Sequence, residues 1–271
     1  MSIAVILNNG YKMPVIGFGV YQITGQECVQ CVKSAIEVGY RHIDTAQMYG
    51  NEKEVGDGIR LSKLPRNQIF VTTKVCTSGY QATKQSIEDS IQRFGFPYFD
   101  LIIIHWSMSD NLGTYRALEE AYRQGKAKAI GLSNFNERNF LHIYNNCQIK
   151  PAVNQIETHL HFAQKKMHNF LTKYGCVHES WSPFGGAGAR CLEDSTLKMV
   201  AAKYGKTPAQ VLLRYLLHCG IVVIPKTVNR NRMIENINIF NFKLNPQDIQ
   251  ILSKCDRGQG MAWSGMQEEF Y

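Results

Sequence analysis

The 271-residue sequence predicts an α/β protein of the (β/α)8 barrel class, also called the TIM barrel. Short apolar runs rich in Val and Ile alternate with segments of helical periodicity along almost the whole chain, which is typical of repeated βα units around a parallel sheet. A closed barrel of this class needs eight such units. The sequence has eight apolar runs, at residues 15–19, 40–44, 69–74, 99–105, 127–133, 152–157, 176–182 and 221–226. No linker, internal repeat or low-complexity tract divides the chain, so we expect one barrel domain over residues 1–271.

The segments between these runs carry helix boundary signals. Thr24 and Ser78 are placed to cap helices that end before Gly39 and Gly95. Pro208 suits the first turn of a later helix. Further helices are predicted near residues 114–123, 137–146, 165–174 and 208–218.

Two segments lie outside the eightfold pattern. Residues 5–13, with Asn9-Gly10 at the centre, predict a β-hairpin with a tight turn, which we expect to close the bottom of the barrel. Residues 245–254, with Pro246 in a first-turn position, predict an extra C-terminal helix. The Gly-rich residues after Asp256 are predicted to be irregular.

Composition and the N-terminal residues narrow the class of protein. Residues 1–7 lack a basic segment, and their apolar run is broken at residues 8–10, so neither a signal peptide nor a membrane span is predicted. We expect a cytoplasmic protein with no membrane partner. The eight cysteines are predicted to be free thiols. Cys28 and Cys31 form a C-x-x-C pair inside a helical pattern without zinc spacing, so no metal is expected.

The formal net charge of +8 raises the possibility of a nucleic-acid partner. The basic residues are scattered, however, and only residues 226–232 concentrate them modestly. This distribution favours a bound small anion over a duplex, and we expect a monomer with no nucleic-acid partner.

Polar residues stand at the ends of the predicted strands, where barrels of this class place their active sites. Asp44, Lys74 and His105 end three consecutive strands, and Tyr49 follows Asp44 by a short loop. A phenol has a pKa near ~10, and a neighbouring ammonium such as Lys74 is expected to lower it, which makes Tyr49 a candidate general acid. His105 is a candidate hydrogen-bond donor to a substrate oxygen. Each residue also has a structural interpretation, as an ion pair, a loop aromatic or a core histidine.

Three segments together resemble the aldo-keto reductases, over nearly the whole chain. They are Gly39-Tyr40-Arg41-His42-Ile43-Asp44-Thr45-Ala46-Gln47-Met48-Tyr49-Gly50-Asn51-Glu52, Thr73-Lys74-Val75 and Ile103-Ile104-His105-Trp106. The resemblance implies that Tyr49 protonates the substrate oxygen, that Lys74 and Asp44 tune it, and that His105 positions the carbonyl. Because the family's double-bond reductases carry glutamate in place of this histidine, His105 favours reduction of aldehydes or ketones to alcohols.

The resemblance also implies a nicotinamide cofactor, although the sequence lacks a complete Rossmann fingerprint. Ser133, Asn134 and Gln155 would hydrogen-bond the carboxamide, and Trp181 would stack on the nicotinamide ring. The adenosine-phosphate end is expected to select NADPH: two cations would neutralise the 2′-phosphate, a hydroxyl would bond to it, and two further side chains would face the adenine. The two cations are Lys226 and Arg232, and the hydroxyl is that of Thr227. The side chains expected to face the adenine are Glu235 and Asn236. The remaining expected cofactor contacts are Gly19, Val20, Tyr21, Asp44, Ser182, Phe184 and Val228.

The expected partner is a small carbonyl substrate bound by Tyr21, Tyr49, His105 and Trp106, with Trp263 as a further candidate wall. The sequence departs from relatives at residues 107–110 and 158–161, in a short loop at 185–193 and in an abbreviated tail after residue 256. These departures predict a more open pocket. A non-catalytic barrel that keeps the cofactor site, as a sensor or a structural subunit, remains an alternative.

Overall fold

The computed structural model describes residues 3–186, 190–258 and 260. Eight parallel strands follow one another around the sheet in chain order. They are β3 (Phe18–Gly19), β4 (His42–Asp44), β5 (Phe70–Val75), β6 (Phe99–Ile104), β7 (Ala127–Ser133), β8 (Val153–Glu157), β9 (Val177–Trp181) and β10 (Val222–Val223). The first and last strands meet through a parallel bridge between Ile16 and Val223, and the Gly17 amide donates to the Val223 carbonyl at 2.8 Å. The chain is therefore a (β/α)8 barrel, as predicted.

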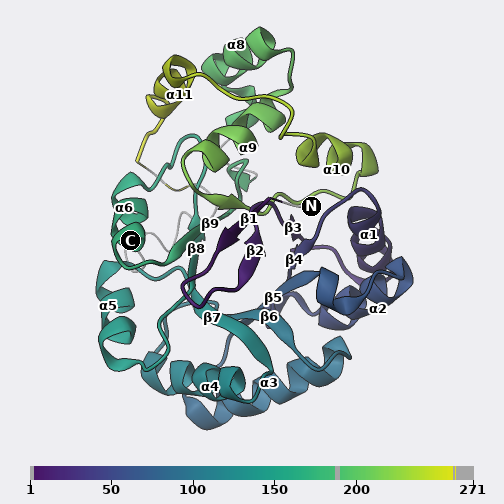
Figure 1. Cartoon of the computed structure of the whole chain (residues 1–271), viewed down its shortest axis with the longest axis vertical. Helices are drawn as coiled ribbons and strands as arrows, with labels where there is room; N and C mark the ends of the chain where they lie inside the picture. The colour runs from purple at the N-terminus through teal and green to yellow at the C-terminus, as the bar shows by residue number, and fades with distance from the viewer. Residues whose placement is uncertain (1–2, 187–189, 259, 261–271) are drawn as a thin grey trace.

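Helices surround the strands on the outside of the barrel (Figure 1). They are α1 (Gly25–Glu37), α2 (Glu52–Ser62), α3 (Tyr80–Phe94), α4 (Asn111–Arg123), α5 (Glu137–Asn146), α6 (Lys165–Lys173), α8 (Ser195–Tyr204), α9 (Pro208–His218), α10 (Arg230–Ile237) and α11 (Pro246–Ser253). Helices α5 and α9 have the predicted bounds, whereas α2, α8 and α10 were not predicted. None of the helices among the described residues is long and apolar enough to cross a membrane.

Two of the predicted helix caps are wrong in detail. Thr24 occupies the N-cap of α1 but makes no capping hydrogen bond through its side chain. The N-cap of α3 is Gly79, with φ of 88°, and not Ser78. The Ser78 hydroxyl instead accepts a hydrogen bond from the Asp110 amide at 3.0 Å, because the loop before α4 lies against it. The cap of α9 follows the usual rule, since the Thr207 side chain accepts from the Gln210 amide ahead of Pro208 in the first turn.

The N-terminal hairpin closes one end of the barrel, as expected. Strands β1 (Ala4–Ile6) and β2 (Lys12–Pro14) pair antiparallel with Val5 opposite Met13. Figure 1 shows this hairpin lying across the centre of the ring of strands. Leu7 and Met13 are buried and belong to a cluster with Phe70, Leu101 and Val153 at that end of the interior. The burial of these apolar side chains excludes water from the bottom of the barrel.

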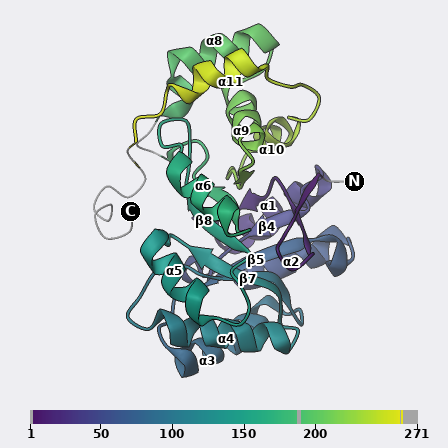
Figure 2. The same ribbon diagram turned by 60° about the vertical axis from the view of Figure 1, so that its left-hand side comes forward.

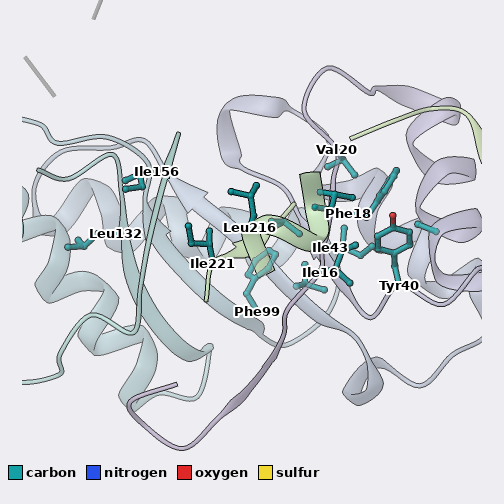
Figure 3. Close-up of a cluster of buried hydrophobic side chains, with 14 of the residues drawn as sticks. Ile16, Phe18, Val20, Tyr40, Ile43, Phe99, Leu132, Ile156, Leu216 and Ile221 are labelled. Carbon is teal, nitrogen blue, oxygen red and sulfur yellow. The ribbon is translucent and has the colours of Figure 1, made fainter. Parts of the chain in front are cut away.

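Alternation along each strand decides which side chains enter the barrel. In β6, Leu101 and Ile103 belong to the interior cluster, while Ile102 and Ile104 belong to the larger cluster between strands and helices. Figure 3 shows Phe18, Tyr40 and Ile43 close together in that larger cluster. By the same alternation on β4, Ile43 faces the helices, so the side chains of His42 and Asp44 on either side of it face the barrel interior.

The C-terminal helix α11 begins at Pro246, and the Asn245 side chain caps it by accepting from the Asp248 amide at 2.8 Å. Figure 2 shows α11 beside α8 at one end of the molecule, remote from α3 and α4. An ion pair from Lys203 of α8 to Asp248 of α11, at 2.8 Å, supports this placement. The predicted extra helix is confirmed.

Candidate active site

Lys74, near the end of β5, contacts polar groups at and just after the end of β4. Its Nζ lies 2.5 Å from Asp44 Oδ1, 3.0 Å from the Thr45 carbonyl oxygen and 3.3 Å from Tyr49 OH. Asp44 and Lys74 are 2% and 1% exposed. The structure thus brings the predicted pair together and places the phenol against the ammonium.

The predicted lowering of the Tyr49 pKa is wrong in its net direction. Burial raises the pKa of Tyr49, and although Lys74 acts to lower it, burial outweighs this effect. For Lys74, burial acts to lower the pKa, but Asp44 and Tyr49 outweigh burial and the net pKa is raised. At neutral pH Tyr49 therefore holds its proton and Lys74 holds its charge.

His105 faces the same phenol from the next strand end. Its ring centroid lies 5.8 Å from that of Tyr49, with the rings nearly perpendicular at 76°. Burial, together with the charge of Lys74, lowers the pKa of His105 to about 3. The imidazole is therefore neutral at physiological pH and carries one N–H, which suits it to donate a hydrogen bond rather than a proton.

The segment that carries Tyr49 is fixed by its neighbours. A single 3-10 turn, Gln47–Tyr49, ends at Gly50, whose φ of 65° gives the left-handed conformation that closes the turn. The side chain of Asn51 then donates to the carbonyl oxygens of Val20 and Ile23 at 2.9 and 2.8 Å. These bonds hold the phenol in place before any ligand arrives.

The predicted carboxamide site is assembled around Asn134, which has a φ of 60°. Its Nδ2 donates to the His105 carbonyl oxygen and to Ser133 Oγ, both at 3.0 Å, and its Oδ1 accepts from Trp181 Nε1 at 2.8 Å. Gln155 Nε2 donates to Asp44 Oδ2 at 2.8 Å. Asn134 is therefore bonded directly to the Trp181 ring nitrogen, and Gln155 is bonded to the carboxylate of the Asp44–Lys74 ion pair.

These residues surround a cavity of about 440 Å³ at the C-terminal ends of the strands. Its walls comprise Gly19, Tyr21, Gln22, Asp44, Met48, Tyr49, His105, Trp106, Ser133, Asn134, Gln155, Trp181, Ser182, Pro183, Phe184, Gly186, Ile224 and Lys226. Most of the predicted cofactor and substrate residues thus share one cavity. Sequence reasoning did not predict five of these wall residues as contacts, although each lies within two positions of a predicted one. They are Gln22, Met48, Pro183, Gly186 and Ile224.

Some predicted residues lie away from the cavity wall. The side chain of Val20 is fully buried. Thr227, Val228 and Arg232 continue from Lys226 toward the start of α10, and Val228 and Arg232 are exposed. Glu235 and Asn236 lie within α10: Glu235 Oε1 accepts from Thr207 Oγ1 at 2.7 Å, and Asn236 is buried. Trp263 lies outside the described residues.

Glu179 was also missed, although it touches the site. It is fully buried on β9, and its Oε2 accepts from Gln155 Nε2 at 2.8 Å. The available signal was a glutamate in the middle of a strand, two positions before Trp181, where an inward-facing apolar residue is the usual choice.

Residues 15–257 match the family described as Aldo/keto reductase family. The chain is 41% identical to the 9,11-endoperoxide prostaglandin H2 reductase of Trypanosoma cruzi, over 93% of this chain and 91% of the relative. It is also 41% identical to the glyoxal reductase of Bacillus subtilis, over 93% of each chain. The solved structure of a Bombyx mori aldo-keto reductase in complex with NADP superposes with a TM-score of 0.89 and 30% identity, covering 96% of this chain and 94% of that one.

The match spans all eight strands of the barrel and includes every residue of the cavity wall. The likeness therefore extends to both the fold and the segments that form the site. The chain belongs to the aldo/keto reductase family of oxidoreductases.

Proposed function

We propose that this chain reduces aldehydes or ketones to alcohols with NADPH, using Tyr49 as the proton donor. The observation that carries the proposal is the position of Lys74 Nζ between Asp44 Oδ1 and Tyr49 OH, at 2.5 and 3.3 Å, beside the cavity. If Asp44 and Lys74 formed only a structural ion pair, there would be no need for the protonated phenol of Tyr49 and the neutral imidazole of His105 to line the same cavity.

The residues present fit a nicotinamide cofactor. Gln155 and Ser133 are buried polar side chains in a wall that also carries aromatic rings, among them Trp181 and Phe184, which suits a planar ring bearing an amide. At the other end, Lys226 and Arg232 are exposed cations that flank the start of α10, suited to a phosphate that NADH lacks. When bound, the reduced nicotinamide supplies a hydride to the carbonyl carbon.

The side chains of this chain then handle the oxygen of the carbonyl. The neutral His105 donates a hydrogen bond that orients the oxygen, and the Tyr49 hydroxyl transfers its proton to it as negative charge develops. Tyr49 is left as a phenolate, which the adjacent Lys74 ammonium stabilises. Asp44 stabilises the charged form of Lys74 in its buried position, so that this stabilisation is available at neutral pH.

The relatives suggest which carbonyls to test first. One is named a glyoxal reductase, so small dicarbonyls such as methylglyoxal are the first candidates. An aromatic aldehyde and a keto-sugar extend the panel toward apolar and polar substrates.

The test is NADPH oxidation, followed by absorbance, with this panel. Tyr49→Phe should lower turnover by roughly 10²- to 10⁴-fold, as expected for loss of a general acid, while NADPH still binds. Tyr98→Phe is the matched control, because Tyr98 lies by Arg66 and Lys128, away from the cavity, and should leave turnover unchanged. If Tyr49→Phe retains full activity, the proposed proton donor is wrong. If NADPH binds to the wild-type protein and every carbonyl fails, a non-catalytic cofactor-binding barrel is favoured instead.

A further inference from the structure

Glu179 is a buried carboxyl group that the proposed reaction does not use. It lies in the interior of the barrel on β9, next to Gln155 in the register of β8 and β9, and is 0% exposed. Its Oε1 has no hydrogen-bond partner and lies 3.8 Å from His42 Nε2. Packing alone would be served better by an apolar side chain at such a position, since burying a polar group costs free energy unless it is bonded.

The bond that Glu179 does make is to Gln155. Gln155 Nε2 donates one hydrogen to Glu179 Oε2 and the other to Asp44 Oδ2, each at 2.8 Å. A primary amide has two N–H donors and one carbonyl oxygen, so both donors are engaged. The group that Gln155 still offers to the cavity is its carbonyl oxygen, Oε1.

We propose that Glu179 is a positioning residue that fixes the side-chain amide of Gln155, so that Oε1 accepts a hydrogen bond from the amino group of the cofactor carboxamide. The inference rests on the proposed function for the identity of the ligand. Asp44 Oδ2 and Glu179 Oε2 each hold one N–H of the amide, and the flipped orientation would set the Gln155 oxygen against the Asp44 carboxylate. Asp44 alone engages only one of the two N–H groups, so without Glu179 the second N–H of the Gln155 amide loses its acceptor.

The protonation state of Glu179 agrees with this role. Burial first, and then the negative charge of Asp44, raise the pKa of Glu179 to about 8, while Gln155 and Lys74 act to lower it. At neutral pH Glu179 is therefore largely a neutral carboxylic acid that accepts through one oxygen without adding a second negative charge beside Asp44. An amide at position 179 keeps such an acceptor, whereas a leucine removes it.

The experiment measures dissociation constants of two ligands for the wild-type protein, Glu179→Gln and Glu179→Leu. The ligands are NADPH and its reduced 3-acetylpyridine analogue, in which a methyl ketone replaces the carboxamide and no amino group remains. We expect Glu179→Leu to weaken NADPH roughly 2- to 10-fold, the range for loss of one well-made hydrogen bond, and to leave the analogue within twofold of the wild type. Glu179→Gln should bind both ligands as the wild type does.

A matched control separates this effect from a general loss of stability. Glu119, on α4, is also buried, accepts from the backbone amides of Gln148 and Ile149, and does not line the cavity. Glu119→Leu should lower the melting temperature without distinguishing the two ligands. If Glu179→Leu does not fold, Glu179→Ser tests the same bond, because its side chain is too short to reach Gln155 Nε2.

The outcomes are distinguishable from those of the proposed function. Equal weakening of both ligands in Glu179→Leu, or no weakening of either, overturns the positioning role even when the enzyme turns over carbonyls. A penalty confined to NADPH supports it even when no carbonyl is reduced. Failure of the wild-type protein to bind NADPH overturns both.

Discussion

Replacing Glu179 by glutamine should change how the free energy of unfolding depends on pH. The pKa of this carboxyl is raised by burial, and further by Asp44, from an ordinary 4.5 to about 8. Between these values the folded chain keeps a proton that the unfolded chain has lost. Stability therefore falls as pH rises through this window, and the loss is complete above the folded-state pKa. Glutamine does not titrate, so the variant should lack this slope.

The magnitude follows from the shift. Each pH unit inside the window changes the unfolding free energy by about 1.4 kcal/mol per proton. Between pH 5 and pH 8 the wild-type protein should thus lose up to about 4 kcal/mol relative to Glu179→Gln. Of the groups that face Glu179, Asp44 and Lys74 form an ion pair. His42, whose pKa is lowered to about 4 by burial, is largely neutral in the folded state across this range.

Denaturant unfolding of both proteins at pH 5, 6, 7 and 8 measures this difference. The glutamine amide buries an extra N–H, but that cost does not vary with pH and cancels when differences are compared across the series. The titration of His42 in the unfolded chain is common to both proteins and cancels as well. If the unfolding free energies of wild type and variant differ by a constant amount at every pH, Glu179 does not keep its proton in the folded protein across this range.

Three further predictions concern the two ends of the barrel. Arg232→Ala should weaken NADPH roughly 10- to 100-fold, the range for a hydrogen bond to a charged group, and change NADH less than twofold, measured as dissociation constants; equal losses would contradict the phosphate site. Trp181→Phe keeps an aromatic face but leaves Asn134 Oδ1 without its 2.8 Å bond, so NADPH binding should weaken several-fold at nearly unchanged melting temperature. An unaltered dissociation constant would show that this bond does not order the site. Met13→Ala should cost about 2–5 kcal/mol in denaturant unfolding without changing kcat, since Met13 plugs the end opposite the cavity; a loss of kcat in the folded variant would show that the plug shapes the active site.

The barrel and its rim were predictable because two independent patterns coincide. Apolar runs of strand length mark the sheet, and Asp44, Lys74 and His105 each stand where such a run ends. Because parallel strands end at one face, the three side chains were expected to meet, and the bond from Lys74 Nζ to Asp44 Oδ1 shows that two of them do. The helix α2 was missed because it begins at Glu52, the last residue of the motif that contains Tyr49, and its sequence is largely polar.

The acidity of Tyr49 was not predictable from the same patterns. The sequence identifies a cationic neighbour, whose sign of effect was predicted correctly, but it does not give the burial that opposes it. The same limit applies to the cofactor end. The resemblance supplied Thr227, Arg232 and Glu235 as a set, but the sequence did not show that Glu235 bonds to the cap of α9.

The alternation of side chains along β9 explains why Glu179 lies inside the barrel. Val177 packs near the closed end of the interior, Trp181 lines the cavity, and Glu179 lies between them on the same side of β9. Inward positions near the plug are filled by apolar side chains, so a carboxyl group one layer higher must be compensated by a specific partner. Its partner is Gln155, which reaches Asp44 on the opposite side of the barrel. The layer beneath the rim is therefore a hydrogen-bonded support for the groups above it, and substitutions there should alter ligand orientation before they alter the chemistry of Tyr49.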